Sequence, residues 1–233
     1  MVLTLSFTPK EAKDIVKALQ EYPSLPSPSA YELARHKVGE ANVTVYTSGK
    51  IVVQGKSALV EEAVEEKIIQ WMGSAHDELV LGIDETGRGE HTGPLVIGGV
   101  VGQRNALRKL RDSKKTSDIT KAYAHATKDS LMNMSISFNA ETIDTLRGKG
   151  FTLNTIEAEA MKKMHELAQV FFPQSITIAD GRPLQKGMKG IVFQEKADDI
   201  EPSVGAASII AKHTRNESGD HATRKSWKTK EKD

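Results

Sequence analysis

Hydrophobic and polar positions along the first 72 residues follow two periods, and together they predict a small α+β domain. Apolar and polar residues alternate from Val2 to Phe7, which favours a strand with one buried face. Thr8, followed by Pro9 and then by Glu11, is typical of a capped helix start, and apolar residues recur at helical spacing beyond it. The domain is therefore expected to begin with a strand and a helix.

The remainder of this segment predicts antiparallel strands and a second helix. Two alternating apolar runs flank the polar stretch 47–50, which indicates a hairpin. Residues 59–72 then have the period of an amphipathic helix. We expect a domain at 1–72, followed by a linker of small and polar residues at 73–77.

Beyond the linker the pattern becomes that of an α/β domain, expected at 78–217. Residues 79–83 and 95–101 are almost continuous apolar runs, which are typical of strands buried on both faces. Further elements follow: strands at 132–138 and 175–179, and helices at 117–129, 140–147, 154–171 and 202–216. The third of these helices is expected to have Asn154 as its cap, with Glu157 three residues later. Strands mixed with helices indicate an α/β core.

Composition and charge narrow the chemistry. The chain has no cysteine, so a metal ion would have to be held by oxygen or imidazole ligands. No apolar run reaches the roughly 18 residues that span a bilayer, and Met1–Phe7 lacks the basic flank of a secretory signal. We therefore expect a cytoplasmic protein without a membrane partner, and a monomer by default. The 32 Lys and Arg residues nearly balance 31 Asp and Glu residues, so overall charge neither requires nor forbids nucleic acid.

Acidic residues stand where two of the predicted strands end. Asp84 and Glu85 follow one apolar strand and Asp180 ends another, while Asp198 and Asp199 lie just before the last helix. Strand ends are where sites form in open α/β sheets, and buried acids are costly unless a cation or hydrogen bonds satisfy them. Taken singly, each acid is more typical of a helix cap or of a solvated surface. Together they favour Mg²⁺ or Mn²⁺, and a two-ion site suited to attack on a phosphodiester.

Polar segments near these acids could contact a nucleic acid. Gly87-Arg88-Gly89 is either a plain turn between strands or a turn whose glycines let the backbone read a 2′-hydroxyl while Arg88 pairs with phosphate. Residues 112–115 form either a solvated turn or a phosphate-binding loop. No His-Glu-x-x-His pattern and no nucleophile-elbow serine occurs, so the sequence does not support a zinc protease or a serine hydrolase.

The last predicted helix combines small residues with three polar ones. The small residues indicate close packing against a neighbour. Ser208, Lys212 and Arg215 are spaced to share one face of the helix, where they could contact phosphates.

These motifs together resemble the type 2 ribonuclease H family, ribonucleases HII and HIII. The resembling blocks occur in the family's order: 82–89 with 93–95, 112–115, 179–181, and 196–198 leading to 202–212. The resemblance implies a ribonuclease H-like mixed sheet flanked by helices. It also implies an endonuclease that cuts the RNA strand of RNA–DNA hybrids.

Residue roles follow from the same resemblance. It implies Asp84, Glu85, Asp180 and Asp198 as the catalytic carboxylates and the ligands of two Mg²⁺ or Mn²⁺ ions. Asp198 is preferred over Asp199 because it stands four residues before Pro202, as in the family. The Gly87–Gly89 turn would read the 2′-hydroxyl, and Ser113 and Lys114 would hold phosphate.

The segment before the linker carries a second resemblance. Its strand–helix–hairpin–helix order, with the motif at 42–55, is similar to the TATA-binding-protein-like domain that precedes the catalytic domain in ribonuclease HIII. The Gly87–Gly89 turn has the HII form, but this domain and the lack of a tyrosine after position 123 favour HIII-like activity. We expect residues 218–233 to be a basic, disordered tail.

Two functions remain open at this point. The first is a hybrid-specific endoribonuclease that leaves 5′-phosphate and 3′-hydroxyl ends. The second is a catalytically weak protein that keeps the fold and only binds hybrids. The four carboxylates argue against the second function, because a pure binder gains nothing from clustered negative charge beside phosphates.

Overall fold

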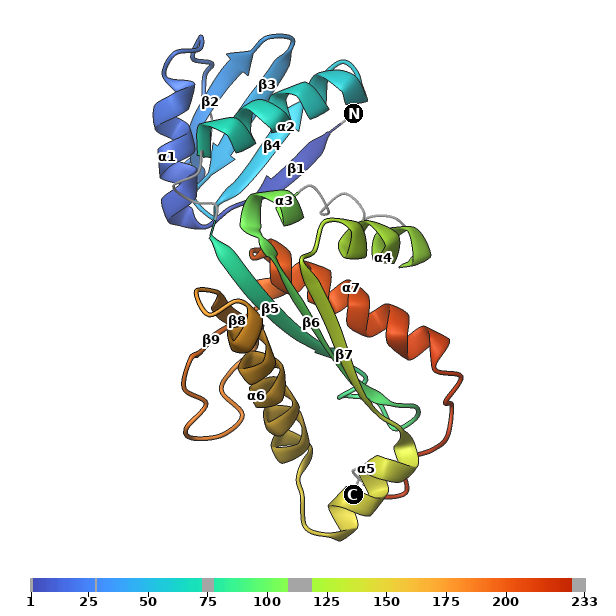
Figure 1. Cartoon of the computed structure of the whole chain (residues 1–233). Coiled ribbons are helices and arrows are strands. Elements are labelled where there is room, and N and C mark those ends of the chain that lie inside the picture. Colours follow the sequence, from blue (N-terminus) through green and yellow to red (C-terminus); the bar gives the residue numbers. More distant parts are fainter. Residues whose placement is uncertain (1, 28, 73–77, 109–118, 228–233) are drawn as a thin grey trace. The chain divides into compact units, whose positions relative to one another are not determined.

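The computed structural model forms two compact units, Met1–Asp77 and Glu78–Asp233. It describes four stretches of the chain: 2–27, 29–72, 78–108 and 119–227 (Figure 1). The linker expected at 73–77, and the expected phosphate contacts Ser113 and Lys114, lie outside these stretches.

Unit 1 is a four-stranded antiparallel sheet with two helices against it. The strand order is β1-β4-β3-β2, and both helices contact the sheet and each other. The elements are β1 (Leu3–Ser6), α1 (Pro9–Leu19), β2 (Glu32–Val38), β3 (Ala41–Tyr46), β4 (Lys50–Gln54) and α2 (Ala58–Met72). The hairpin predicted around residues 47–50 is confirmed as the β3–β4 pair.

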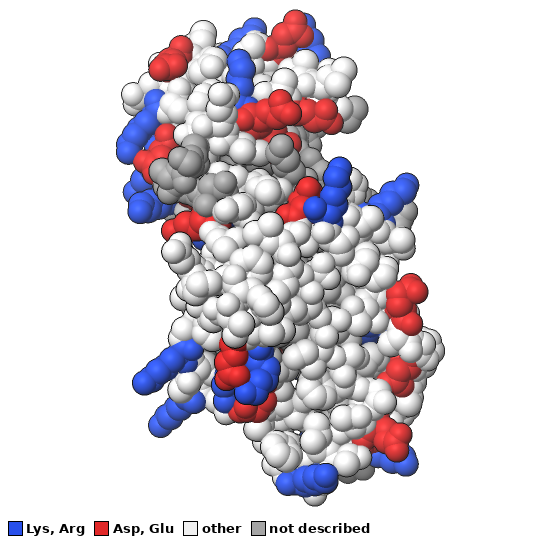
Figure 2. Space-filling model, in the orientation of Figure 1, with Lys and Arg blue, Asp and Glu red and all other residues white. Residues whose placement is uncertain are grey.

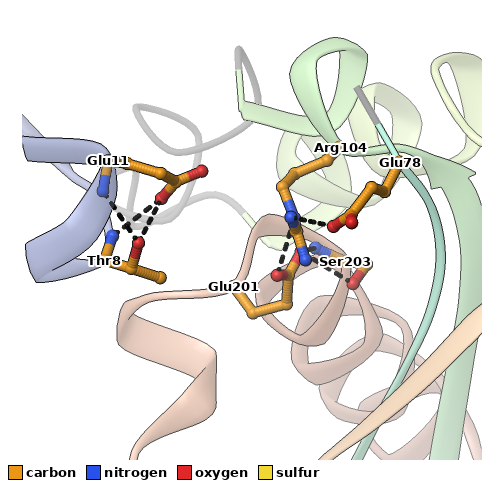
Figure 3. A network of polar contacts seen from close by, with 6 residues as sticks. All are labelled: Thr8, Glu11, Glu78, Arg104, Glu201 and Ser203. Carbon is orange, nitrogen blue, oxygen red and sulfur yellow. Dashed lines mark hydrogen bonds and ion pairs between the residues drawn. The ribbon is translucent and has the colours of Figure 1, made fainter. Parts of the chain in front are cut away.

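The start of α1 is set by local hydrogen bonds, as the sequence predicts. The Thr8 hydroxyl accepts from the amide of Glu11 at 3.2 Å, and the Glu11 carboxylate accepts from the amide of Thr8 at 2.8 Å (Figure 3). These bonds satisfy two backbone donors that a helix start leaves without partners, which stabilises the helix by about 1 kcal/mol. The buried face of α1, including Ala12, Ile15 and Leu19, then turns toward the sheet.

Alternation along the strands of unit 1 separates an apolar face from a polar one. One face joins the core with the helices through residues such as Val43 and Val53. The other face carries a row of cross-strand neighbours, Thr4, Val52, Thr44 and Arg35. The basic and polar residues that alternate with the core residues there include Lys37, Asn42, Lys50 and Gln54.

Unit 2 is built on a five-stranded mixed sheet, which confirms the predicted α/β class. Its strand order is β7-β6-β5-β8-β9, with β5, β6 and β7 antiparallel and β5, β8 and β9 parallel. The elements are β5 (Leu79–Thr86), β6 (Leu95–Gln103), α3 (Arg104–Arg108), α4 (Ile119–Lys128), β7 (Met132–Phe138), α5 (Ala140–Gly148), α6 (Leu153–Phe171), β8 (Ile176–Asp180), β9 (Ile191–Gln194), η3 (Ala197–Asp199) and α7 (Pro202–Glu217). Of these, α3, β9 and η3 were not predicted because each is too short to display a period.

Strand β5 is buried on both faces, as its continuous apolar run predicts. Leu81 and Ile83 join the cluster that includes α6, whereas Val80 joins Val204 of α7 on the other side. Figure 1 shows α6 and α7 on either side of β5 and β6. At Gly82 a Cβ would meet the backbone carbon of Ser203 at 2.1 Å, so only glycine lets α7 come this close. The site at the end of β5 is therefore enclosed by helices from two sides.

An ion-pair network ties α7 to the start of β5. Arg104 donates from Nε to Glu201 at 3.0 Å and from Nη1 to Glu78 at 2.5 Å (Figure 3). Glu201 is the N-cap of α7, and its burial raises the pKa of its carboxyl. Arg104 thus neutralises a buried acid at the helix start.

The expected cap of α6 is wrong by two residues. The helix begins at Leu153, and Thr152 is its N-cap, with its hydroxyl accepting from the amide of Thr155 at 3.1 Å. Asn154 and Glu157 lie inside the helix, so their side chains are free for contacts elsewhere in unit 2. Two capping patterns overlapped in the sequence, and the upstream one prevails.

The expectation of a disordered tail from residue 218 is also wrong as far as residue 227. The segment 218–227 pairs with the loop after β5, with Gly93 donating to the carbonyl of Ala222 at 2.9 Å and Arg224 donating to that of His91 at 2.8 Å. Backbone pairing of this kind is independent of the polar composition that suggested disorder. The last six residues lie outside the part of the chain that the structure describes.

Acidic and basic side chains lie side by side over part of the face drawn in Figure 2. Figure 2 shows acidic and basic side chains together over α6, where Lys162 pairs with Glu159 and Lys163 with Glu166. Among the described helices, none is long and apolar enough to cross a bilayer.

Candidate active site

The sheet topology brings the acids of two strands to one edge. Strands β5 and β8 are parallel neighbours, and Ile83 pairs with Ala179. Asp84 and Asp180 are the next residues on each strand, so they follow at the same level of adjacent strands, which lie about 4.8 Å apart in a sheet. Two of the acids predicted from strand ends are thereby brought together.

Alternation along β5 sends its two acids to opposite faces. Asp84 turns to α7, where the Ser208 hydroxyl lowers the pKa of its carboxyl. Glu85 turns to the α6 side, where Glu157 is the carboxylate that acts on it most strongly. Because both helices pack closely on the sheet, each acid is largely withdrawn from water.

Burial and mutual repulsion raise the pKa values of these acids. Desolvation is the largest cause for Asp84, with the charges of Glu85 and Asp180 adding to it, and the pKa reaches about 7. Desolvation also raises the pKa of Glu85 to about 7, and Glu157 and Asp180 add to the shift. The pKa of Glu157 is likewise raised to about 7, again chiefly by burial. Negative charge here is unfavourable unless a cation compensates it.

Asp198 is brought close to the end of β8 by a hydrogen bond of the residue before it, Ala197 in η3. The amide of Ala197 donates to the Asp180 carboxylate at 2.7 Å, which joins η3 to the strand end. Asp198 is half-buried, whereas Asp199 is exposed. Of these two acids, Asp198 is therefore the one that faces into the protein.

The donor set fits a hard divalent cation. In the described stretches, no three acidic or histidine side chains already stand as a group able to hold one ion. The acids at the strand ends are nevertheless all oxygen donors, and they raise one another's pKa. Carboxylate oxygens in such a setting suit Mg²⁺ or Mn²⁺ better than softer metals. Asp84, Glu85, Asp180 and Asp198 are the residues that could hold such ions.

The glycines of the turn after β5 have different surroundings. Gly87 has φ of +82°, and a Cβ on it would meet the carbonyl oxygen of Pro94 at 2.3 Å and Nε of Arg215 at 2.7 Å. A Cβ on Gly89 would meet nothing within 4 Å. The turn is therefore packed from beneath at Gly87 and open at Gly89.

Arg88, between these glycines, reaches toward α6. Its Nε lies 3.0 Å from a carboxylate oxygen of Glu157, and its Nη2 donates to the side-chain oxygen of Asn154. The side chain is still 39% exposed, so it is not wholly consumed by these contacts.

Two of the three α7 residues expected to contact phosphate are engaged within the protein. Ser208 is only 2% exposed, and its hydroxyl acts on the pKa of Asp84. Arg215 donates to the carbonyl of Pro94 at 3.2 Å and to Glu90 at 2.6 Å. The close approach of α7 to the sheet buries Ser208, whereas the Arg215 side chain stays 20% exposed, and a phosphate contact by either residue stays a prediction. Lys212 is exposed, so its side chain can reach a phosphate.

Sequence reasoning missed Glu157 as a member of the site because it was interpreted as part of a cap. A signal was available, since Glu157 shares a helical stripe with the apolar residues Met161, Met164 and Ala168. A single acid on an apolar stripe needs a partner in the folded protein. Asn154 gave no comparable signal.

Comparisons with known proteins identify relatives of both parts of the chain. A family model described as Ribonuclease HII matches residues 81–233, and one described as a domain of unknown function (DUF3378) matches residues 2–67. A ribonuclease HII of Methanosphaera stadtmanae is 34% identical over 150 residues, which cover 59% of this chain and 71% of that protein. A ribonuclease HIII of Protochlamydia amoebophila is 38% identical over 125 residues, which cover 48% of this chain but only 41% of that protein.

A solved structure extends the likeness to both units. The crystal structure of Bst-RNase HIII in complex with Mn²⁺ aligns with a TM-score of 0.56 at 20% identity, and the alignment covers 93% of this chain and 81% of that one. At this identity the match concerns the fold alone. Its coverage includes the N-terminal sheet as well as the mixed sheet.

Proposed function

This chain belongs to the ribonuclease HII family, and we propose that it is an HIII-like endoribonuclease that cuts the RNA strand of RNA–DNA hybrids and leaves 5′-phosphate and 3′-hydroxyl ends. The observation that carries the proposal is the meeting of Asp84, Glu85 and Asp180 at the ends of parallel neighbours β5 and β8. Family membership supports ribonuclease H activity, and this arrangement supports the residues that perform it.

The chain's own groups orient the proposed catalytic carboxylates. Asp84 accepts from the amide of Glu85 at 2.9 Å, which orients its side chain, and the Ser208 hydroxyl beside it lowers its pKa. The Asp180 carboxylate is held by the amide of Ala197. When bound by these acids and Asp198, two Mg²⁺ or Mn²⁺ ions would supply the charge that activates water and stabilises the leaving 3′-oxygen.

Backbone groups of the turn after β5 are the proposed readers of RNA. The open space at Gly89 allows a sugar to approach the backbone closely, and a 2′-hydroxyl there would distinguish RNA from DNA. Gly87 and Arg88 complete the turn, and exposed Lys212 is a proposed phosphate contact. Ser113 and Lys114 remain proposed phosphate contacts on the strength of the family resemblance.

The HIII-like part of the proposal rests on unit 1. Its sheet turns a polar face with Arg35, Lys37 and Lys50 away from its own helices, and such a face suits a phosphate backbone. We propose that this face binds the hybrid and that the protein prefers runs of RNA to single embedded ribonucleotides.

A cleavage assay on a labelled hybrid tests the proposal. Asp84→Asn is expected to abolish cleavage while leaving hybrid binding largely intact, and EDTA is expected to stop the wild-type reaction until Mg²⁺ or Mn²⁺ is added. Asp198→Asn and Asp199→Asn form a matched pair, of which only the first is expected to lose activity. Retained cleavage by Asp84→Asn would overturn the assignment of the site. Hybrid binding without cleavage by the wild type would favour the catalytically weak alternative.

A second substrate separates the two kinds of specificity. A DNA duplex with one embedded ribonucleotide is expected to be cut much more slowly than a hybrid with a run of RNA. Equal cleavage of both would contradict the HIII-like part of the proposal and leave the ribonuclease H part standing.

A further inference from the structure

The ion pair between Arg88 and Glu157 joins the turn after β5 to helix α6. The two residues are far apart in the sequence, yet Nε of Arg88 lies 3.0 Å from Oε2 of Glu157. Asn154, one helical turn earlier on α6, accepts from Nη2 of the same guanidinium. A planar guanidinium held through two of its nitrogens has little freedom to rotate.

Glu157 is placed where a carboxylate would otherwise be unfavourable. Its side chain is 2% exposed and lies on the stripe of α6 that packs into the apolar core. The negative charge of Asp84 acts against its ionisation, and the positive charge of Arg88 favours it. A purely structural position on this stripe would be filled at lower cost by an apolar residue. The acid is therefore best explained by what it holds.

The turn is fixed at two points, which are the packing around Gly87 and the contacts of Arg88 with α6. Gly87 is packed against Pro94 and Arg215 from beneath, whereas Gly89 is open on the side proposed for the substrate. The position of the open side then depends on where the residue between the two glycines is held. Arg88 is that residue.

We propose that Glu157, assisted by Asn154, is a positioning residue that holds Arg88 against α6 and thereby fixes the Gly87–Gly89 turn beside Asp84 and Glu85. For its effect on the substrate, this proposal rests on the proposed function. A turn fixed in advance binds its substrate without first losing conformational freedom, so the contact is stronger than that of a mobile turn.

The expected consequence is a weaker hold on the substrate rather than a failure to fold. Glu157→Gln keeps the size of the side chain and removes the charge that holds Arg88. We expect it to raise the KM for a hybrid roughly tenfold, equivalent to about 1.4 kcal/mol, with a smaller change in kcat. Glu159→Gln is the matched control, because Glu159 lies two residues further along α6, is exposed and pairs with Lys162. It should leave the KM unchanged.

A double-mutant cycle decides whether Glu157 acts through Arg88. Glu157→Gln, Arg88→Met and the double variant are compared in KM and kcat on a hybrid. If the two residues act as a unit, Glu157→Gln has no further effect once Arg88 is replaced. Additive effects, or a change in kcat produced by Glu157→Gln in the Arg88→Met background, would mean that Glu157 acts on the carboxylates directly and would overturn the proposal.

Amide hydrogen exchange of residues 86–90 tests the same proposal without a substrate. Exchange in the turn is expected to speed up roughly tenfold in Glu157→Gln and in Arg88→Met, but not in Glu159→Gln. Unchanged exchange in both would refute the positioning role even if the enzyme is fully active. If the wild type fails to bind or cut hybrids, the proposed function fails, but the exchange rates still decide whether Glu157 and Arg88 fix the turn. If Glu157→Gln does not fold, the exchange rate of Arg88→Met decides whether the contact between Arg88 and α6 fixes the turn.

Discussion

Substituting Gly82 by alanine should separate α7 from the sheet and disturb the site at the same time. Gly82 lies two residues before Asp84 on the same face of β5. A Cβ there would lie 2.1 Å from the backbone carbon of Ser203 and 2.2 Å from the backbone nitrogen of Val204. Both neighbours are backbone atoms in the first turn of α7, so no side chain can rotate away to make room.

The size of the effect follows from these distances. Carbon atoms pack at about 3.5 Å or more, so α7 would have to retreat by about 1.4 Å from its contact at 2.1 Å. The first ten residues of α7 are all buried, and the retreat would open gaps along that whole face. Inserting a methyl group into a packed core usually costs about 1–3 kcal/mol, and a clash with backbone belongs at the upper end. For a unit of this size about 3 kcal/mol lowers the melting temperature by roughly 6–12 °C.

Thermal unfolding followed by circular dichroism measures this effect, with hybrid cleavage as a second readout. Gly148→Ala is the matched control, since a Cβ on Gly148 at the end of α5 would meet nothing within 4 Å. It should unfold within about 2 °C of the wild type. Cleavage by Gly82→Ala should fall even at temperatures where it is folded, because Ser208 on α7 would move away from Asp84. A Gly82→Ala protein that melts with the wild type would refute the described packing of α7.

Two further predictions concern groups that the fold places in unexpected roles. Ser208→Ala removes the hydroxyl that lowers the pKa of the Asp84 carboxyl, so that pKa should rise further in a carboxyl titration followed by NMR; an unchanged Asp84 pKa would contradict the contact. The pKa of Asp144 lies below its ordinary value of 3.8, chiefly because Ser226 donates to it, and the Lys225 amide donates as well. A carboxyl whose pKa is lower in the folded protein than in the unfolded chain stabilises the fold at pH values above the unfolded-chain pKa, and this contribution is lost as the pH falls through the folded-state pKa. Protection of the Lys225 and Ser226 amides from exchange should therefore decline below about pH 4. Asp144→Asn should already have low protection at neutral pH, and a pH-independent protection in the wild type would refute the role.

Local patterns were sufficient for most of the regular elements. The Thr8–Glu11 capping box is confirmed because both partners lie within one helical turn, and its energy depends on nothing further away. The continuous apolar run before Asp84 predicts a strand buried on both faces, and the two helix-bearing clusters around β5 confirm it. The α6 cap was misassigned because Thr152 and Asn154 offer the same local chemistry, and the choice between them depends on where the chain enters the helix.

The candidate site shows what local patterns leave undecided. The sequence places acids at the ends of two strands, but only the parallel pairing of β5 and β8 makes Asp84 and Asp180 neighbours. Ser208 has the spacing of a phosphate contact, yet the close approach of α7 to the sheet buries it, and Arg215 on the same helix is engaged by Glu90 and the carbonyl of Pro94.

The sequence by itself determined that the chain has an N-terminal α+β segment followed by an α/β segment. It also determined the acids and glycines of the candidate site. Both follow from hydrophobic period and residue type, which are properties of short stretches. Tertiary structure alone decided the partners of the charged groups that pair across long stretches of the chain. Glu157 became a partner of Arg88, and residues 218–227 became a segment paired with the turn rather than a free tail. The reason is that burial and pairing join residues far apart in the chain, and their spacing in sequence carries no record of that contact.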